Sequence, residues 1–218
     1  MSEVFRKPSE SMAFHPRRGL RRLAPEVTKW AMVREILVWP HPLLKQRAKP
    51  VERVDDEIRA LIKDMYDSMY AADGVGLAAP QVGVLKAVIV LDTTPRQADS
   101  HPVAMVNPEI LSLDGKTIYR EGCLSVPGEA EDVERATSVT VRYLDEHGEE
   151  KTLSVEGLFA IAIQHETDHL KGVMFVDYIS TLKRELIRKR MKKVQAAMAE
   201  EKKTDEKKDS AKRAAEAR

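Results

Sequence analysis

Apolar residues at helical spacing predict the first regular element of the chain, a helix that runs to about Ala72. Asp55 or Asp56 can cap its start, because a carboxylate there accepts hydrogen bonds from unpaired backbone N–H groups. Gly74 is expected to end it. The apolar positions share one face, which indicates that this helix covers a core. They are Ile58, Leu61, Ile62, Met65 and Met69.

A second helix is predicted from about Glu156 to Lys171, with Gly172 as the residue that follows its end. Residues 157–163 are apolar on every side of this helix, which is typical of a buried helix. A third helix begins after the capping residue Ser180 and is amphipathic at first. Its apolar positions are Leu182, Leu186, Ile187, Met191 and Val194.

Short runs of β-branched residues between the first two helices predict strands. Residues 87–91 form a continuous apolar run, typical of a buried strand. Residues 139–143 alternate and, with residues 152–155 across a turn at 146–148, predict a hairpin. Weaker candidates are residues 103–106 and 117–119. This order of elements predicts an α+β fold, in which a mostly antiparallel sheet packs around the buried second helix, with a further C-terminal helix.

Composition excludes several classes of protein. The chain has 218 residues, a formal net charge of +1 and one cysteine, which fits one domain with appendages and selects neither nucleic acid nor membrane as a partner. One cysteine cannot form an internal disulfide, which favours a reducing compartment such as the cytoplasm and leaves bacterial or organellar residence open. No transmembrane helix or secretory signal is expected, since no apolar run is long enough or suitably placed.

The chain divides into three parts by composition. Residues 1–33 carry scattered prolines and arginines with little periodicity, which predicts an irregular or disordered arm. Residues 34–182 hold most of the predicted elements and form the expected folded domain. Residues 183–218 are expected to form a basic helix and then a charged tail that is partly helical or disordered. The first eleven residues of this last part include seven basic residues and one acid.

The segment His165-Glu166-Thr167-Asp168-His169 carries the most informative chemistry. Side chains at positions i and i+4 of a helix share one face, about 6 Å apart at Cβ, so the two imidazoles can bind one divalent metal ion. Glu166 lies about 100° around the helix and can reach a metal-bound water without being a ligand. Buried histidines and acids are costly unless they are paired or bind a metal. The segment therefore predicts metal-assisted hydrolysis.

A catalytic metal usually takes three protein ligands and a water, so two histidines leave the site one ligand short. In metzincin proteases the third ligand is a histidine six residues after the second histidine. That position is Phe175 here, which excludes this class of protease. Thermolysin-like proteases use a downstream glutamate, but Glu185 lies among basic residues, as on a solvated helix face. The remaining candidate is Cys123, although a lone cysteine is more often a small buried hydrophobic residue.

Three segments of the chain together resemble the signature motifs of the peptide deformylases. They are Gly74–Gln81 (GVGLAAPQ), Glu121–Ser125 (EGCLS) and His165–His169 (HETDH), and their order and separation also match. The resemblance covers roughly residues 34–182, which it implies are a deformylase catalytic domain. The implied metal ligands are Cys123, His165 and His169. The implied native metal is Fe²⁺, for which Ni²⁺, Co²⁺ or Zn²⁺ can substitute.

The resemblance also implies a reaction, the removal of the formyl group from the N-terminal formylmethionine of newly made polypeptides. Glu166 would be the acid and base: it accepts a proton as metal-bound water attacks the formyl carbon, then returns it to the leaving amine. Gln81 and the backbone N–H of Leu124 would stabilise the oxyanion. The implied substrate-binding residues, each of which could equally be an ordinary core or turn residue, are Val75, Gly76, Gly122, Leu158, Ile161 and Ala162, with Tyr119 a further candidate.

The chain departs from the family pattern in two places. The stretch Gly128–Asp132 lacks an arginine that contacts the peptide in many relatives, and Asp73 stands where some relatives have glutamate. Both changes leave the chemistry in place. They concern how the substrate is held beyond its first residue.

Several alternatives stay open at this point. The basic helix resembles extensions that are thought to dock on the ribosome near the peptide exit, where binding to rRNA would be salt-sensitive; the alternative is a solvated helix. The metal motif would also suit a zinc endoprotease, or a binding protein with a structural metal. A structural site takes four protein ligands. The sequence offers three convincing ones, which counts against a structural metal.

Overall fold

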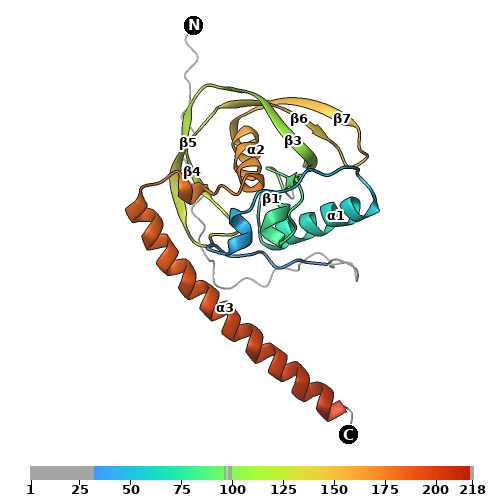
Figure 1. The fold of residues 1–218 in the computed structure, drawn as a ribbon, viewed down its shortest axis with the longest axis vertical. Helices are drawn as coiled ribbons and strands as arrows, with labels where there is room; N and C mark the ends of the chain where they lie inside the picture. Colours follow the sequence, from blue (N-terminus) through green and yellow to red (C-terminus); the bar gives the residue numbers. More distant parts are fainter. Residues whose placement is uncertain (1–31, 96, 98–99, 217–218) are drawn as a thin grey trace. The chain divides into compact units, whose positions relative to one another are not determined.

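Residues 32–95, 97 and 100–216 are described by the computed structural model of the chain (Figure 1). They all fall in one unit that covers residues 31–218. The predicted arm of residues 1–33 lies outside the described residues, apart from its last two positions.

The main sheet has five strands in the order β1-β2-β3-β6-β7, and all neighbouring strands are antiparallel. Their bounds are β1 Gly76–Ala78, β2 Val88–Leu91, β3 Val103–Asp114, β6 Ser138–Leu144 and β7 Glu150–Glu156. A separate antiparallel pair is formed by β4 (Thr117–Gly122) and β5 (Ala130–Arg135). The predicted α+β fold with a mostly antiparallel sheet is confirmed.

Strand β3 is much longer than the predicted residues 103–106, because it continues past a β-bulge at Asn107. This residue has a positive φ of 52°, and the register of β3 against β6 shifts between Val106 and Glu109. The Asn107 side chain accepts a hydrogen bond from the Val51 N–H and donates one to the Val51 carbonyl, both at 2.8 Å. The bulge lets pairing resume beyond Pro108.

Helix α1 (Asp56–Ala71) confirms the first predicted helix. Asp55 is the capping residue, and its side chain accepts from the Ile58 N–H at 3.1 Å. All five predicted apolar positions are buried against β1 and β2. The predicted end is wrong in one detail: the left-handed residue after the helix is Asp73, with φ 53°, and not Gly74. Aspartate tolerates this conformation better than most residues.

Helix α2 (Gly157–Leu170) confirms the predicted buried helix. Every residue from Ala160 to Leu170 is buried. The helix packs against the main sheet, where Ala160, Ala162 and Ile163 share a core cluster with residues of β2, β3 and β6 (Figure 1). Gly172 follows the helix with φ 74°, and a Cβ there would lie 2.5 Å from the Lys45 carbonyl oxygen.

Helix α3 (Thr181–Glu216) begins after Ser180, whose hydroxyl accepts from the Lys183 N–H at 3.4 Å. Ile187 and Met191 are buried in a third core cluster. Leu182 and Leu186 were expected on the same apolar face, but they are 73% and 46% exposed.

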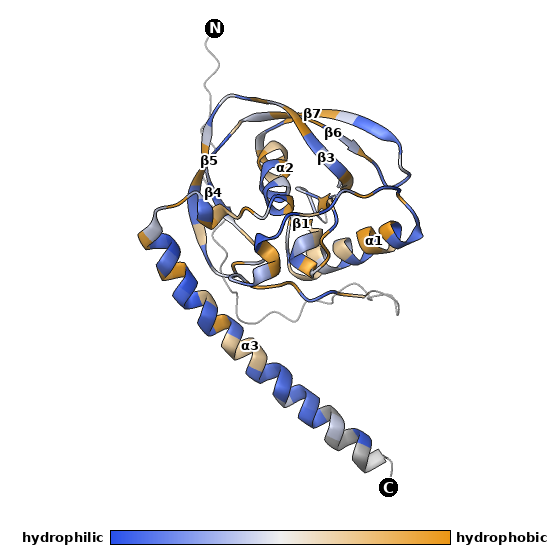
Figure 2. Cartoon of the chain, viewed as in Figure 1, coloured by the Kyte–Doolittle hydropathy of each residue, from blue (hydrophilic) through white to orange (hydrophobic). Residues whose placement is uncertain are grey.

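The helix continues through the segment that was expected to be a partly helical or disordered tail. Most of α3 is hydrophilic (Figure 2). In the described part of the chain, no helix is long and apolar enough to cross a bilayer.

Candidate metal centre

Cys123, His165 and His169 converge in the fold, with potential ligand atoms that all lie within 4.8 Å of one another. Sγ of Cys123 is 3.3 Å from Nε2 of His169, and the two imidazole rings meet edge to face with centroids 4.9 Å apart. Metal bonds of about 2.0–2.3 Å around a tetrahedral centre put donor atoms about 3.3–3.8 Å apart. The 3.3 Å separation of Cys123 and His169 lies in this range, and the limit of 4.8 Å on the other pairs exceeds it by about 1 Å, so the three side chains are placed to bind one divalent metal ion.

Local structure explains why these side chains meet. The two histidines lie one turn apart on α2, and Cys123 follows the last residue of β4. A turn holds the cysteine, with the Val126 N–H donating to the Cys123 carbonyl at 2.8 Å. The alternative glutamate lies elsewhere, since Glu185 pairs with a neighbouring arginine on α3. Phe175, at the position of the metzincin third ligand, is fully buried in the third core cluster and has no donor atom.

Glu121 orients one of the histidines. Its Oε2 lies 2.8 Å from Nδ1 of His165, so a carboxylate that accepts from Nδ1–H leaves Nε2 available to a metal. Burial by itself would raise the pKa of Glu121, but hydrogen bonds from His165 and Arg135 outweigh burial and lower that pKa to about 2. Glu121 therefore remains charged at neutral pH.

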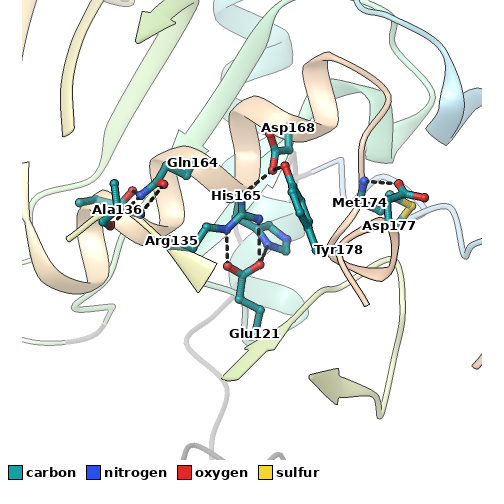
Figure 3. Close-up of polar contacts among 10 residues, drawn as sticks. Glu121, Arg135, Ala136, Gln164, His165, Asp168, Met174, Asp177 and Tyr178 are labelled. Carbon is teal, nitrogen blue, oxygen red and sulfur yellow. Dashed lines mark hydrogen bonds and ion pairs between the residues drawn. The ribbon is translucent and has the colours of Figure 1, made fainter. Parts of the chain in front are cut away.

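Arg135 joins Glu121 to a second buried acid, Asp168 (Figure 3). Its Nε and Nη2 donate to the two Glu121 oxygens at 2.6 and 3.0 Å, and its Nη1 donates to Oδ2 of Asp168 at 2.6 Å. The Tyr178 hydroxyl donates to the same Asp168 oxygen at 2.8 Å. Burying charges costs several kcal/mol for each ion, and hydrogen-bonded opposite charges offset that cost.

The sequence patterns predicted no role for Glu121, Arg135 or Asp168. Two signals were available: Glu121 opens the EGCLS motif, and Asp168 lies in the helix that was predicted to be buried. Arg135 gave no signal, because an arginine usually indicates an exposed position. It is only 6% exposed.

Glu166 is buried, and its Oε2 has no hydrogen-bond partner among the described residues. Burial is the largest influence on its carboxyl and raises the pKa to about 7. A carboxyl with that pKa can accept or release a proton near neutral pH, as an acid/base catalyst must. Burial also lowers the pKa of His169. At His165, hydrogen bonding to Cys123 and Glu121 outweighs burial and raises the pKa.

Gln81 directs its amide N–H groups toward the sulfur. Its Oε1 accepts from the Ala78 N–H at 2.7 Å, which turns Nε2 toward Ser125 Oγ at 3.2 Å and Cys123 Sγ at 3.5 Å. The extended chain before η1 (Pro42–Lys45) joins these segments, because the Leu37 N–H donates to the Gln81 carbonyl and the Trp39 N–H to the Ser125 carbonyl. The side-chain amide is thus fixed before any substrate arrives. Leu124, whose backbone N–H was the second expected oxyanion donor, follows Cys123 directly.

The expected substrate-binding residues lie in three places. Gly76 begins β1 and Val75 precedes it. Tyr119 and Gly122 lie on β4, and Leu158, Ile161 and Ala162 lie on α2 before His165. Ala162 belongs to the core cluster under the main sheet, as an ordinary core residue would. Gly122 is exposed, while Val75, Tyr119 and Leu158 are half-buried.

Comparison with known proteins gives one consistent result. Residues 33–185 match the family model described as polypeptide deformylase. A peptide deformylase of Phenylobacterium zucineum (strain HLK1) is 55% identical over 162 residues, which are 74% of this chain and 96% of the relative. The crystal structure of a peptide deformylase from Legionella pneumophila aligns with a TM-score of 0.72 and 45% identity, over 77% of this chain and 98% of that one. The Met-Ala-Ser-bound structure of a class I type b peptide deformylase from Acinetobacter baumannii aligns with a TM-score of 0.64 and 39% identity, over 68% and 98%.

Proposed function

This chain belongs to the polypeptide deformylase family, and we propose that it hydrolyses the formyl group from N-terminal formylmethionine with one metal ion at Cys123, His165 and His169. The observation that carries the proposal is the convergence of these three donors beside the buried Glu166. We place the catalytic domain at residues 34–182, which the family match over residues 33–185 supports.

The side chains around the metal position account for each step of an amide hydrolysis. When bound, a divalent metal supplies a Lewis acid that activates water for attack on the formyl carbon. Glu166 accepts the proton that the water loses, and returns it to the amine nitrogen as the C–N bond breaks. The products are formate and a free amino terminus. The N–H groups of Gln81 and Leu124 donate to the oxygen that becomes negatively charged.

We propose Fe²⁺ as the native metal, with Ni²⁺, Co²⁺ or Zn²⁺ able to substitute. One thiolate and two imidazoles suit these transition metals better than they suit Mg²⁺ or Ca²⁺, which prefer oxygen ligands. The thiolate of Cys123 is also open to oxidation. Fe²⁺ is itself oxidised in air, whereas Ni²⁺ is not, so we expect the enzyme to lose activity in air faster with Fe²⁺ than with Ni²⁺.

We propose that the methionine and the following peptide bind beside β1, β4 and α2, through Val75, Gly76, Gly122, Leu158, Ile161 and Ala162. Strand β1 is at an edge of the main sheet, and an extended peptide can pair with an edge strand through main-chain hydrogen bonds. The Acinetobacter baumannii relative was solved with Met-Ala-Ser bound, a tripeptide that begins with an unformylated methionine.

Formate release from formyl-Met-Ala-Ser is the direct test of this function. Protein purified without oxygen is expected to contain a transition metal in an equimolar amount and to release formate, and a chelator should abolish the activity because Glu166 and Gln81 alone cannot activate water sufficiently. Re-addition of Ni²⁺ or Co²⁺ should restore it. Cleavage of unformylated intact proteins without formate release would favour the zinc endoprotease instead.

We also propose that α3 docks on the ribosome in the cytoplasm of a bacterium, where the substrate emerges. The relatives named above come from bacteria, and α3 exposes Lys189, Lys192 and Lys193. Contacts with rRNA phosphates release counterions, so binding should weaken steeply with salt.

Co-sedimentation with ribosomes tests the docking. The triple variant Lys189→Glu, Lys192→Glu, Lys193→Glu is expected to lose salt-sensitive co-sedimentation, while Lys207→Glu, Lys208→Glu, farther along α3, serves as the control. Truncation after Leu182 is a poorer test, because it removes Ile187 and Met191, which are buried. Co-sedimentation that does not respond to salt or to the triple variant would argue against docking.

A further inference from the structure

Gly76 has no side chain at the point where β1 faces the carboxyl group of Glu166. A Cβ atom built on Gly76 would lie 2.5 Å from Oε1 of Glu166 and 3.0 Å from its Cδ and Cγ. Carbon and oxygen atoms in a packed interior do not approach so closely without displacement. All three of these nearest atoms belong to Glu166, so the space left at residue 76 is occupied by this one side chain.

The backbone conformation does not explain the glycine. Gly76 is not among the glycines with positive φ, and it pairs regularly with Leu91 of β2 in the antiparallel sheet. Alanine adopts ordinary strand conformations without strain. In the described structure, the atoms that a side chain at residue 76 would meet are those of Glu166.

Glu166 depends on packing for its position. Its side chain is buried, and Oε2 has no hydrogen-bond partner in the part of the chain that the structure describes. The helix that carries it packs on β1 and is buried at every residue from Ala160 to Leu170. A Cβ atom at residue 76 would therefore push the carboxyl group out of the position that this packing gives it.

We propose that Gly76 is a positioning residue for Glu166: the absence of a Cβ atom keeps the carboxyl group where it exchanges protons with water and the leaving amine. This inference rests on the proposed function. It differs from the main-chain contact with substrate that the family resemblance implies for Gly76. An added methyl group keeps the main-chain N–H and C=O but occupies the place of Oε1.

Kinetics separate the two roles. If Gly76 positions Glu166, Gly76→Ala should lower kcat about 100-fold, within the range that acid/base catalysis contributes, with unchanged metal content. If Gly76 only contacts the peptide, the substitution should raise KM and leave kcat unchanged.

Thermal denaturation of four metal-loaded proteins, which together form a double-mutant cycle, tests the contact without reference to catalysis. They are the wild type, Gly76→Ala, Glu166→Ala and the double variant. With Glu166 present, Gly76→Ala should lower Tm by about 3–10 °C, as overpacking does in a domain of this size. In the Glu166→Ala background no such drop is expected, because the shortened side chain leaves room for the methyl group.

Gly122→Ala is the matched control for the denaturation cycle. The nearest atom to a Cβ there is the Glu129 carbonyl oxygen at 3.6 Å, an ordinary contact. Its effect on Tm should be the same in both backgrounds. If Gly76→Ala does not fold but the double variant does, the cycle supports the contact equally.

Two results would overturn the inference: an equal loss of Tm in both backgrounds, or a Gly76→Ala enzyme with unchanged kcat. Failure of the proposed function looks different. In that case the wild type itself releases no formate from formyl-Met-Ala-Ser, while the denaturation cycle still measures the contact.

Discussion

Glu166→Gln is expected to lower kcat for formate release by about 10²–10⁴-fold, the range that acid/base catalysis contributes, and to leave the metal content unchanged. The amide has nearly the shape of the carboxyl group but cannot accept the proton of the attacking water. Glu166 is buried and has a raised pKa of about 7, which suits it to accept that proton near neutral pH. Steady-state kinetics and metal analysis of the same preparation measure both quantities.

The control for this experiment is Glu134→Gln, which changes an exposed carboxylate on β5 that pairs with Lys116. Its kcat should equal that of the wild type. A binding protein with a structural metal would bind its partner equally well with Glu166→Gln and show no formate release in either form. Loss of metal from Glu166→Gln would contradict the assignment of Glu166 as a residue that is not a ligand.

Arg135→Met is expected to destabilise the fold by about 3–5 kcal/mol, the usual cost when one partner of a buried ion pair is removed. Glu121 and Asp168 are 3% and 8% exposed, and both would lose the guanidinium group that pairs with them in Figure 3. Urea denaturation of the metal-loaded protein measures this free energy of unfolding.

Arg135→Met should also weaken metal binding by about 10–100-fold, as the loss of residues that orient metal ligands typically does. Glu121 would lose the two hydrogen bonds that hold it against His165. Competition with a chelator of known affinity measures the effect.

Arg142→Met is the matched control, since it removes an arginine from an exposed pair with Glu109 on the main sheet. Exposed pairs contribute little, so its unfolding and metal affinity should resemble those of the wild type. If Arg135→Met behaves like Arg142→Met, the buried network does not stabilise the centre.

Local patterns in the sequence predicted those parts of the fold that depend on neighbouring residues along the chain. Asp55 caps α1 and the apolar face of that helix is buried, as its spacing indicated.

Predictions failed where tertiary contacts override local preference. Strand β1 consists of Gly76, Leu77 and Ala78, of which only leucine has a substantial side chain to indicate a strand. In β5 one of the inward-facing residues is Arg135, so the alternation of apolar and polar residues is hidden.

In helix α3, by contrast, local spacing predicted more buried residues than the fold covers. Spacing placed Leu182, Leu186, Ile187 and Met191 on one apolar face, but only the last two are buried. A helical pattern identifies the face that can be covered, and the position of the rest of the fold decides how much of it is covered. Here the third core cluster reaches Ile187 and Met191, whereas Leu182 and Leu186 remain exposed.

By itself, the sequence determined that α2 is buried and carries two imidazoles and an acid with the spacing for metal-assisted hydrolysis, because four residues along a helix define one face. Spacing could not choose between Cys123 and other third ligands, nor reveal that Arg135 connects Glu121 to Asp168. Those contacts join residues of β4, β5 and α2 that are far apart along the chain. Only the pairing of β4 with β5 and the packing of α2 bring such residues together, since no local preference encodes a distance across the fold.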